Sequence, residues 1–205
     1  MLIGISLGPG DPELMTFKAA KVLQSCMKVF VPGEMAAELA RPYCSPETLD
    51  FPMIEDEQEL EMCWAKNADI VASFASKGLA GFAVLGDVNT FSTFSHLKKV
   101  VKDRYPAIEV TTMPGVSVVP ALASCFGIAL DRSFEISDGS DVEIKIRMKA
   151  THPNKLANDL QREGFEEFIL GTRLYTSQEE IIRGKAQDMP EHSDYFSILY
   201  ARRNI

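Results

Sequence analysis

Cysteine, histidine and clustered positive charge are all scarce in this sequence, and each scarcity excludes a class of function. The four cysteines lie far apart and form no C-x-x-C motif, so neither a zinc site of that type nor a dithiol redox centre is expected. The three histidines are isolated and lack the spacing of metal ligands, so no metal site is predicted. Lysine and arginine number 21 against 29 acidic residues, and their dispersal argues against a nucleic-acid-binding face.

Long uninterrupted apolar runs are also missing. Residues 113–130 carry no charged group, but Pro114, Gly115 and Pro120 interrupt this run. A turn and a buried helix are therefore a better interpretation than a membrane span. No signal peptide is recognised, and the separated cysteines favour reduced thiols. We therefore expect a cytoplasmic protein with neither a membrane nor a nucleic-acid partner.

What the sequence does contain is an alternation of short apolar runs and amphipathic segments. Such β–α alternation is typical of an α/β protein with a mainly parallel sheet. The strands predicted in this way are residues 2–7, 29–31, 81–85 and 108–112. The first helix is expected to bury a stripe formed by Phe17, Ala20 and Leu23.

The pattern changes after residue 113, which predicts two successive α/β domains. The first comprises residues 1–113 and has a mainly parallel sheet, and the second comprises residues 114–205 and has a mixed sheet. The later strands are predicted at residues 142–148, 167–170 and 195–201, with a helix near residues 153–163.

Three glycine-containing turns directly follow three of the predicted strands. They have the sequences LGPGDP at residues 7–12, GD at residues 86–87 and MPGVS at residues 113–117. Open α/β sheets bind ligands at the carboxyl ends of their strands. Three turns at three such ends therefore predict one shared pocket.

The first of these turns is unsuited to a phosphate group. Pro9 and Pro12 have no N–H to donate, and Asp11 would repel an anion. A G-x-G-x-x-G register also fails, because Glu13 occupies the place of its last glycine. A rigid turn of this kind suits a nucleoside without phosphate. In the second turn, Asp87 either borders such a ligand or caps the following helix.

Taken in order, these turns resemble the motifs of the tetrapyrrole (corrin and porphyrin) methyltransferase family. The matching segments are GPGDPELMT at residues 8–16, GD at 86–87 and PGVS at 114–117. Further segments are similar to the precorrin-2 / cobalt-factor II C20-methyltransferase branch: FPM at 51–53, STF at 92–94, MK at 148–149, YFS at 195–197 and RR at 202–203. The sequence departs from that branch at Val88, where proline is common.

The resemblance implies two α/β domains with a cleft between them that holds S-adenosylmethionine, and it implies a homodimer. The implied activity is methylation of C20 of precorrin-2 or cobalt-factor II in cobalamin (corrinoid) biosynthesis. The positions that match the family's cofactor contacts are Pro9, Leu85, Gly86, Asp87, Thr90, Ser117, Val118, Met148 and Gly171.

A tetrapyrrole carries many carboxylates, so local cations are expected around its site even though the chain is acidic. Lys145, Arg147 and Lys149 alternate along one predicted strand and so share a face, and Arg173 follows Gly171 closely. They either clamp carboxylates or form an ordinary solvated face. No catalytic base is assigned, because turn formation is an alternative duty for the nearby acids Asp11 and Asp87.

Three other functions remain open. A different tetrapyrrole methylase, such as a cobalt-precorrin-4 or precorrin-4 C11-methyltransferase, would have the same fold, and STF at residues 92–94 is the reason to prefer C20. A diphthine synthase would also share the fold, but the turn at residues 8–11 argues against it. A non-catalytic nucleoside-binding module would bind the methyl donor without turnover.

Overall fold

The structure is a computed structural model that describes residues 1–52 and 56–203. The chain divides into two compact units, Met1–Arg132 and Ser133–Ile205, and each is described by itself. Residues 114–132, which the sequence assigned to the second domain, fall with the first unit. Hydrogen bonds from the segment that follows residue 112 back to Ser6 and Asp87 give the reason. Met53, part of one segment used for the resemblance, lies outside the described residues.

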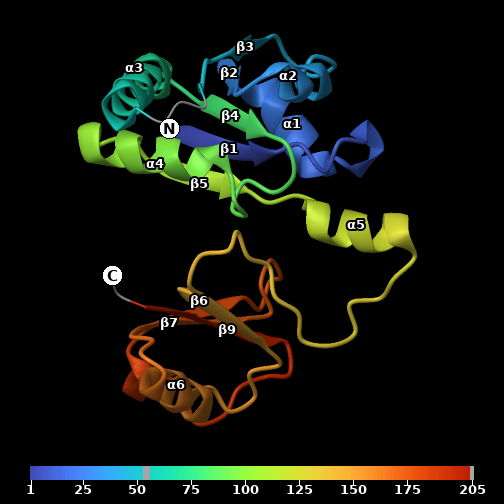
Figure 1. Cartoon of the computed structure of the whole chain (residues 1–205), viewed down its shortest axis with the longest axis vertical. Helices are drawn as coiled ribbons and strands as arrows, with labels where there is room; N and C mark the ends of the chain where they lie inside the picture. Colours follow the sequence, from blue (N-terminus) through green and yellow to red (C-terminus); the bar gives the residue numbers. More distant parts are fainter. Residues whose placement is uncertain (53–55, 204–205) are drawn as a thin grey trace. The chain divides into compact units, whose positions relative to one another are not determined.

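A five-stranded, wholly parallel sheet is the centre of the first unit (Figure 1), which confirms the predicted parallel sheet. The strand order is β3-β2-β4-β1-β5. The strands are β1 (Leu2–Ser6), β2 (Lys28–Val31), β3 (Pro46–Thr48), β4 (Ala80–Val84) and β5 (Val110–Met113). Because β4 returns between β2 and β1, the carboxyl ends of β4, β1 and β5 are immediate neighbours.

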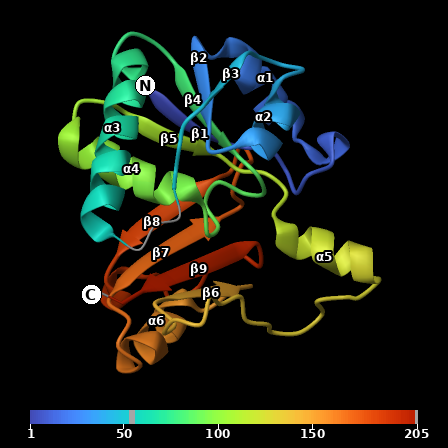
Figure 2. The same ribbon diagram turned by 45° about the horizontal axis from the view of Figure 1, so that its top comes forward.

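Helices cover both faces of this sheet (Figure 2). One face packs around Phe30, Phe82 and Phe94, and the other around Ile5, Leu7 and Leu23. The first face is covered by α3 (Glu57–Ala75) and α4 (Thr93–Arg104), and the second by α1 (Phe17–Ser25) and α2 (Glu34–Ala40). A short 3-10 helix, η1 (Pro12–Leu14), precedes α1.

The buried face of α1 differs from the predicted stripe at the start of the helix. Thr16 caps the helix, its Oγ1 accepting a hydrogen bond from the Ala19 N–H at 3.1 Å. Ala19 and Leu23 are buried, whereas Phe17 is 92% exposed, so the predicted stripe is wrong at its first member. Phe17 and Leu23 are six residues apart, and six residues of α-helix rotate by about 600°, which is about 240° more than one full turn. The two side chains therefore point in different directions from the helix axis.

The helix α5 (Val118–Phe126) follows the third turn and ends at Gly127, whose φ of 63° is left-handed. A helix was predicted here, but its predicted burial is wrong, since none of its residues is buried. The reason is that α5 joins neither of the two clusters that pack on the sheet. Within the described part of the chain, no helix combines the length and apolarity needed to cross a membrane.

The second unit contains a four-stranded sheet in the order β6-β9-β7-β8, and every pairing in it is antiparallel. The predicted mixed sheet is therefore wrong. A helix between two strands is typical of adjacent parallel strands, but here β9 lies between β6 and β7 and runs antiparallel to both. The strands are β6 (Ile144–Met148), β7 (Glu167–Thr172), β8 (Glu180–Gly184) and β9 (Ser197–Arg202).

Among the described residues of the second unit, helices pack on one face of its sheet. The helix α6 (Pro153–Arg162) and the short η2 (Ala186–Asp188) pack there on a core that includes Phe165, Phe168 and Leu199. The opposite face carries exposed apolar side chains, among them Ile146 and Met148. Within the second unit, the two faces therefore offer different chemistry: one packs against helices and the other carries apolar side chains.

Candidate functional site

The three glycine turns of the first unit meet at one edge of the sheet, as their sequence positions predicted. Gly8 and Gly86 form an isolated β-bridge: the Gly86 N–H donates to the Gly8 carbonyl at 2.7 Å, and the Gly8 N–H donates to the Gly86 carbonyl at 3.3 Å. Both glycines have positive φ, 82° and 70°, which few side chains tolerate. The first two turns are thus joined directly through their backbones.

Asp87 joins the third turn to the second. Its Oδ2 accepts a hydrogen bond from the Gly115 N–H at 2.8 Å, and its Oδ1 accepts from the Asn89 N–H at 2.9 Å and from Thr90 Oγ1 at 3.3 Å. The alternative in which Asp87 caps the following helix is wrong, because Ser92 caps α4 through the Phe94 N–H. Asp87 instead holds together the turns that follow β4 and β5.

Ser6, the last residue of β1, is a member of this site that sequence reasoning missed. It is fully buried, and its Oγ donates to the Met113 carbonyl at 2.7 Å and accepts from the Val88 N–H at 2.9 Å. A contact of 3.4 Å also joins it to Asp87 Oδ2. The only signal in the sequence was a polar residue at the end of an apolar strand.

The first turn is fixed by its own acid. Asp11 Oδ1 accepts a hydrogen bond from the Glu13 N–H at 2.9 Å and so caps η1, with Pro12 as the first helical residue. A side chain at Gly8 would place its Cβ 2.9 Å from the Leu14 carbonyl oxygen, so the turn closes tightly on itself. Pro9 lies at its centre and is half-buried.

Apolar side chains are exposed in the segments that follow all three turns. Phe17 follows the first turn, Phe91 the second and Val118 the third, and their exposed fractions are 92%, 67% and 63%. Ser117, beside Val118, caps α5 by accepting from the Val119 N–H at 3.3 Å. Leu85 is half-buried against the core that also contains Leu7. A ligand at these turns would therefore meet bare backbone and apolar groups.

In the second unit, the two predicted cofactor residues lie on the same face of the sheet. Met148 and Gly171 are both register partners of Ile198, so the three form one row across β6, β9 and β7. Met148 is 72% exposed on this open face. A Cβ at Gly171 would lie 2.8 Å from Leu174 Cδ2, so the Leu174 side chain packs directly on the bare main chain of Gly171.

The predicted cations of β6 lie on the other face. Lys145 pairs in register with Ala201 and Arg147 with Leu199, two core residues on the helix-covered side. The Lys145 ammonium forms an ion pair with Glu163 and lies 5.1 Å from the centre of the Phe165 ring. Lys145 and Arg147 therefore share a face, as predicted, but it is opposite to the face of Met148.

Lys149 is not on that face, because β6 ends at Met148 and Lys149 has a left-handed φ of 56°. Its ammonium lies 5.1 Å from the centre of the Tyr195 ring, and a hydrogen bond with the Tyr195 side chain raises the pKa of Lys149. The prediction that three cations share one face is thus wrong for Lys149. Lys149 directly follows Met148, a predicted cofactor contact, whereas Arg147, which directly precedes Met148, lies on the helix-covered face.

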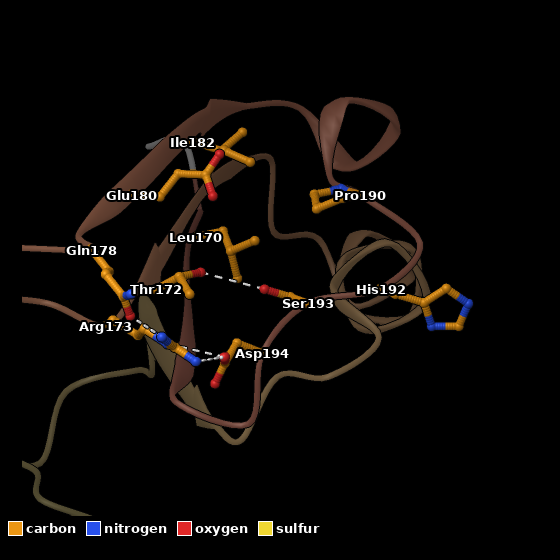
Figure 3. Close-up of a pocket in the computed structure, with 10 residues that line it drawn as sticks. All are labelled: Leu170, Thr172, Arg173, Gln178, Glu180, Ile182, Pro190, His192, Ser193 and Asp194. Atoms are coloured by element: carbon orange, nitrogen blue, oxygen red, sulfur yellow. Dashed lines mark hydrogen bonds and ion pairs between the residues drawn. The ribbon is translucent and has the colours of Figure 1, made fainter.

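Arg173 borders a polar pocket of about 410 Å³ in the second unit (Figure 3). Its Nη2 donates to Asp194 Oδ2 at 2.6 Å, and its Nη1 donates to Gln178. The pKa of Asp194 is held below its ordinary value, mainly by a hydrogen bond from the backbone N–H of Phe196 and to a lesser extent by one from the Arg173 side chain. Arg173 is therefore already engaged in holding the loop after β7 to the segment that precedes β9.

The chemistry of these groups suits binding and alignment. Among residues 1–52 and 56–203, no group of three or more histidine, cysteine or acidic side chains could hold a metal ion. The acids of the turns, Asp11 and Asp87, have structural partners that account for their positions. Backbone carbonyls at the turns can accept hydrogen bonds from an ammonium or a hydroxyl group, and the missing side chains of Gly10 and Gly86 let such a group approach the main chain.

Comparisons with known proteins identify what the chain is similar to. Residues 1–190 match the family described as Tetrapyrrole (Corrin/Porphyrin) Methylases. The chain is 28% identical to a Methanocaldococcus jannaschii protein named "Probable cobalt-precorrin-2 C(20)-methyltransferase", over 98% of this chain and 95% of that protein. It is 31% identical to the cobalt-precorrin-2 C(20)-methyltransferase of Salmonella typhimurium, over 60% of this chain and 55% of that protein.

A solved structure shares the fold. The uroporphyrin-III-C-methyltransferase of Thermus thermophilus superposes with a TM-score of 0.52, is 18% identical, and is matched over 98% of this chain and 91% of its own. The likeness extends over almost all of both chains, which confirms the predicted two-part α/β fold.

Proposed function

The chain belongs to the tetrapyrrole (corrin/porphyrin) methylases, and from this premise we propose that it transfers a methyl group from S-adenosylmethionine to C20 of precorrin-2 or cobalt-factor II in cobalamin biosynthesis. Membership of the family makes it a methyltransferase that acts on a tetrapyrrole. Two relatives are named for methylation of the same carbon, and one of them is matched over 98% of this chain.

The observation that carries the donor assignment is the joining of the three turns by the Gly8–Gly86 bridge and the Asp87–Gly115 hydrogen bond. The residues present fit a nucleoside donor. A Cβ built on Gly86 meets nothing within 4 Å, so the bare main chain of the second turn borders open space. Pro9 removes an N–H from the first turn, which suits a nucleoside without phosphate better than a phosphate group.

We assign the donor contacts of the first unit to Pro9, Leu85, Gly86, Thr90 and the pair Ser117-Val118. Asp87 shapes this surface, because its carboxylate holds the second and third turns at a fixed separation. Met148 and Gly171, which share one row of the second sheet, are the proposed contacts from the second unit. Every one of these positions also matches a cofactor contact in the family resemblance.

S-adenosylmethionine supplies an activated methyl group on a positively charged sulfur, and that charge is lost in the reaction. Strong stabilisation of the initial charge would slow the transfer, so apolar walls favour it. Val118 in the first unit and Met148 in the second, exposed by 63% and 72%, are the apolar side chains that we propose for this role. The remaining task of the protein is to orient the reactants, which can lower a barrier by on the order of 7 kcal/mol or more.

The choice of C20 over C11 rests on the named relatives and less on the STF segment that first suggested it. In the structure Ser92 caps α4, and Phe94 is buried in the core, where its ring lies 2.5 Å from a Cβ built on Gly4. Both residues therefore have structural duties that any methylase of this fold could require. A C11-methyltransferase remains the alternative function.

Of the predicted cations, we retain Lys149 as a tetrapyrrole contact because it directly follows Met148. Lys145, Arg147 and Arg173 are better explained as structural or solvated groups, given the partners of Lys145 and Arg173 and the helix-covered face of Arg147. A homodimer, implied by the family resemblance, is part of the proposal and is tested by the mass in solution from light scattering.

The function is tested by incubating the protein with methyl-labelled donor and either metal-free precorrin-2 or cobalt-factor II, and then locating the label by NMR. Label at C20 supports the proposal. Precorrin-4 and its cobalt form are assayed in parallel, and label at C11 of either one, without turnover of the first two substrates, replaces the proposal with the alternative. Calorimetric binding of S-adenosylhomocysteine without turnover on any of these substrates indicates a binding module. Methylation of a protein substrate instead would indicate the diphthine synthase alternative.

A further inference from the structure

We propose that Ser6 is a positioning residue for the methyl donor, and that it acts through a hydrogen bond that only a non-proline residue at position 88 can supply. The inference rests on the proposed function and concerns the same site. Ser6 does not border the open glycine surface. The turn Gly86-Asp87 borders that surface, and Ser6 supports this turn from its buried side.

The location of Ser6 gives its hydroxyl access to the second and third turns. It ends β1, the strand that lies between β4 and β5, and in register it is the partner of Val84. Its hydroxyl therefore lies between the starts of the second and third turns. The contacts run to Val88 on one side, at 2.9 Å, and to Met113 on the other, at 2.7 Å.

The direction of each hydrogen bond follows from the groups involved. The Met113 carbonyl can only accept, so Ser6 donates its single proton there. The Val88 N–H can only donate, so it donates to a lone pair of the Ser6 hydroxyl oxygen. Asp87 Oδ2 is meanwhile occupied by the Gly115 N–H at 2.8 Å. The Ser6 hydroxyl thus satisfies one buried donor and one buried acceptor from two different turns.

Close packing also limits the size of the side chain at position 6. A Cβ built on Gly115 would lie only 2.5 Å from the Cβ of Ser6, so the third turn presses directly on this residue. Ser6 is fully buried, and Val88 is 1% exposed. Water therefore does not replace the hydroxyl easily, and its loss leaves the Val88 N–H and the Met113 carbonyl without this partner.

Val88 is the second partner of this interaction, because its N–H donates to the Ser6 hydroxyl. The Thr90 N–H donates to the Asp87 carbonyl at 3.1 Å, which makes residues 87–90 a turn with Val88 at its second position. Proline suits that position of common turns, so the backbone there tolerates it. Proline has no N–H, however, and would leave the Ser6 oxygen without its donor. Ser6 and Val88 are therefore expected to be energetically coupled.

The test is a double-mutant cycle on the full chain with Ser6→Ala, Val88→Pro and the double variant. Titration calorimetry with S-adenosylhomocysteine and steady-state kinetics are the measurements. Each single variant is expected to weaken donor binding by about 10-fold. The double variant is expected to bind no worse than either single one, since each change removes the same hydrogen bond. The KM for the donor should rise more than that for the tetrapyrrole.

Asn67→Ala is the matched control for general destabilisation. Asn67 is a buried polar residue of the same unit, and its Nδ2 donates to the Asp50 carbonyl at 2.6 Å, away from the turns. It should lower the melting temperature without changing donor affinity. Wild-type affinity in Ser6→Ala, or independent effects that multiply in the double variant, would overturn the inference. If Ser6→Ala does not fold, unchanged donor affinity in Val88→Pro is enough to reject it.

Failure of the proposed function gives a different result. A wild-type protein that binds neither S-adenosylmethionine nor S-adenosylhomocysteine contradicts the function, whatever the variants do. A wild-type protein that binds the donor, with variants that bind equally well, contradicts only the role of Ser6. Turnover on a different tetrapyrrole carbon leaves the inference intact, because Ser6 acts on the donor turn alone.

Discussion

Replacement of Gly86 by alanine separates backbone strain from ligand contact at the centre of the site. Gly86 has a φ of 70°, and a Cβ built on it meets no protein atom within 4 Å. Alanine therefore introduces strain from the left-handed backbone but no clash within the protein. The added methyl group enters the space that we assign to the donor.

The size of the strain can be estimated. A non-glycine residue in the left-handed region is less stable by about 1–2 kcal/mol. For a chain of this length, that loss lowers the melting temperature by roughly 2–8 °C. The added methyl group is expected to weaken S-adenosylhomocysteine binding by at least about 10-fold, because a displacement on the order of 1 Å disrupts close contacts with the bare backbone.

Gly127 provides a matched control. It has a φ of 63°, it ends α5 instead of a donor turn, and a Cβ built on it also meets nothing within 4 Å. Gly127→Ala therefore carries the same strain at a place that the donor does not use. The two variants are compared by thermal unfolding without ligand and by titration calorimetry with S-adenosylhomocysteine.

The expected outcome is equal destabilisation and unequal binding. Both variants should melt at similarly lowered temperatures, and only Gly86→Ala should lose donor affinity. If Gly86→Ala binds S-adenosylhomocysteine as tightly as the wild type, the open space beside Gly86 is not the donor site. If both variants lose affinity equally, the loss follows from destabilisation and the assignment also fails.

Three further predictions concern the second unit and the thiols. Lys149→Ala should raise the KM for the tetrapyrrole by about 10-fold and Arg147→Ala by less than about 2-fold; the reverse order would restore the clamp on β6. The pKa of Asp194 is lowered by a backbone N–H and by the guanidinium beside it, so its stabilising effect is present above the ordinary pKa and is lost as pH falls through the lowered value. Thermal melting between about pH 5 and pH 2 should therefore depend less on pH in Asp194→Asn, and an unchanged dependence would contradict this. Burial raises the pKa of the Cys26 thiol to about 11, so near pH 8 iodoacetamide should modify exposed Cys125 before Cys26, as followed by mass spectrometry.

Two of the strands that carry the site, β1 and β4, could be predicted because each is a short apolar run that ends at a glycine turn; the third, β5, is rich in β-branched residues and leads into the Pro-Gly turn. β3 (Pro46–Thr48) gave no such signal: it has three residues, starts with proline and leaves two side chains exposed. It exists because its backbone pairs with Val29–Val31 of β2. Pairing of this kind is a tertiary property, and local sequence does not encode it.

The faces of β6 illustrate a second limit. Alternation in the sequence correctly placed Lys145 and Arg147 together, because side chains alternate along any strand. It could not say which face α6 covers, and it could not place the end of the strand at Met148. Ion pairing with Glu163 on the helix-covered side decides the first question, and the left-handed backbone of Lys149 decides the second.

The centre of the site shows the same division between local and long-range information. Turn chemistry at residues 8, 86 and 115 is local, so the sequence predicted all three turns. The hydroxyl that connects two of them is not local: Ser6 is separated by 82 residues from Val88 and by 107 residues from Met113. Only the strand order β4-β1-β5, with β1 between the other two, brings these groups within hydrogen-bonding distance.

The partners of the acids in the turns bear on how catalysis is achieved. Asp87 accepts hydrogen bonds from backbone groups of both the second and third turns, and Asp11 caps η1. Loss of either carboxylate is therefore expected to disturb donor binding before it affects any proton transfer. A base would instead show itself as a lower kcat with an unchanged donor KM and a shifted pH profile. Asp87→Asn retains one oxygen that can accept from the Gly115 N–H, but its amide nitrogen cannot accept from the Asn89 N–H as the second carboxylate oxygen does. The expected result is therefore a raised donor KM with an unshifted pH profile of kcat. A shifted profile would contradict alignment as the main contribution of these turns.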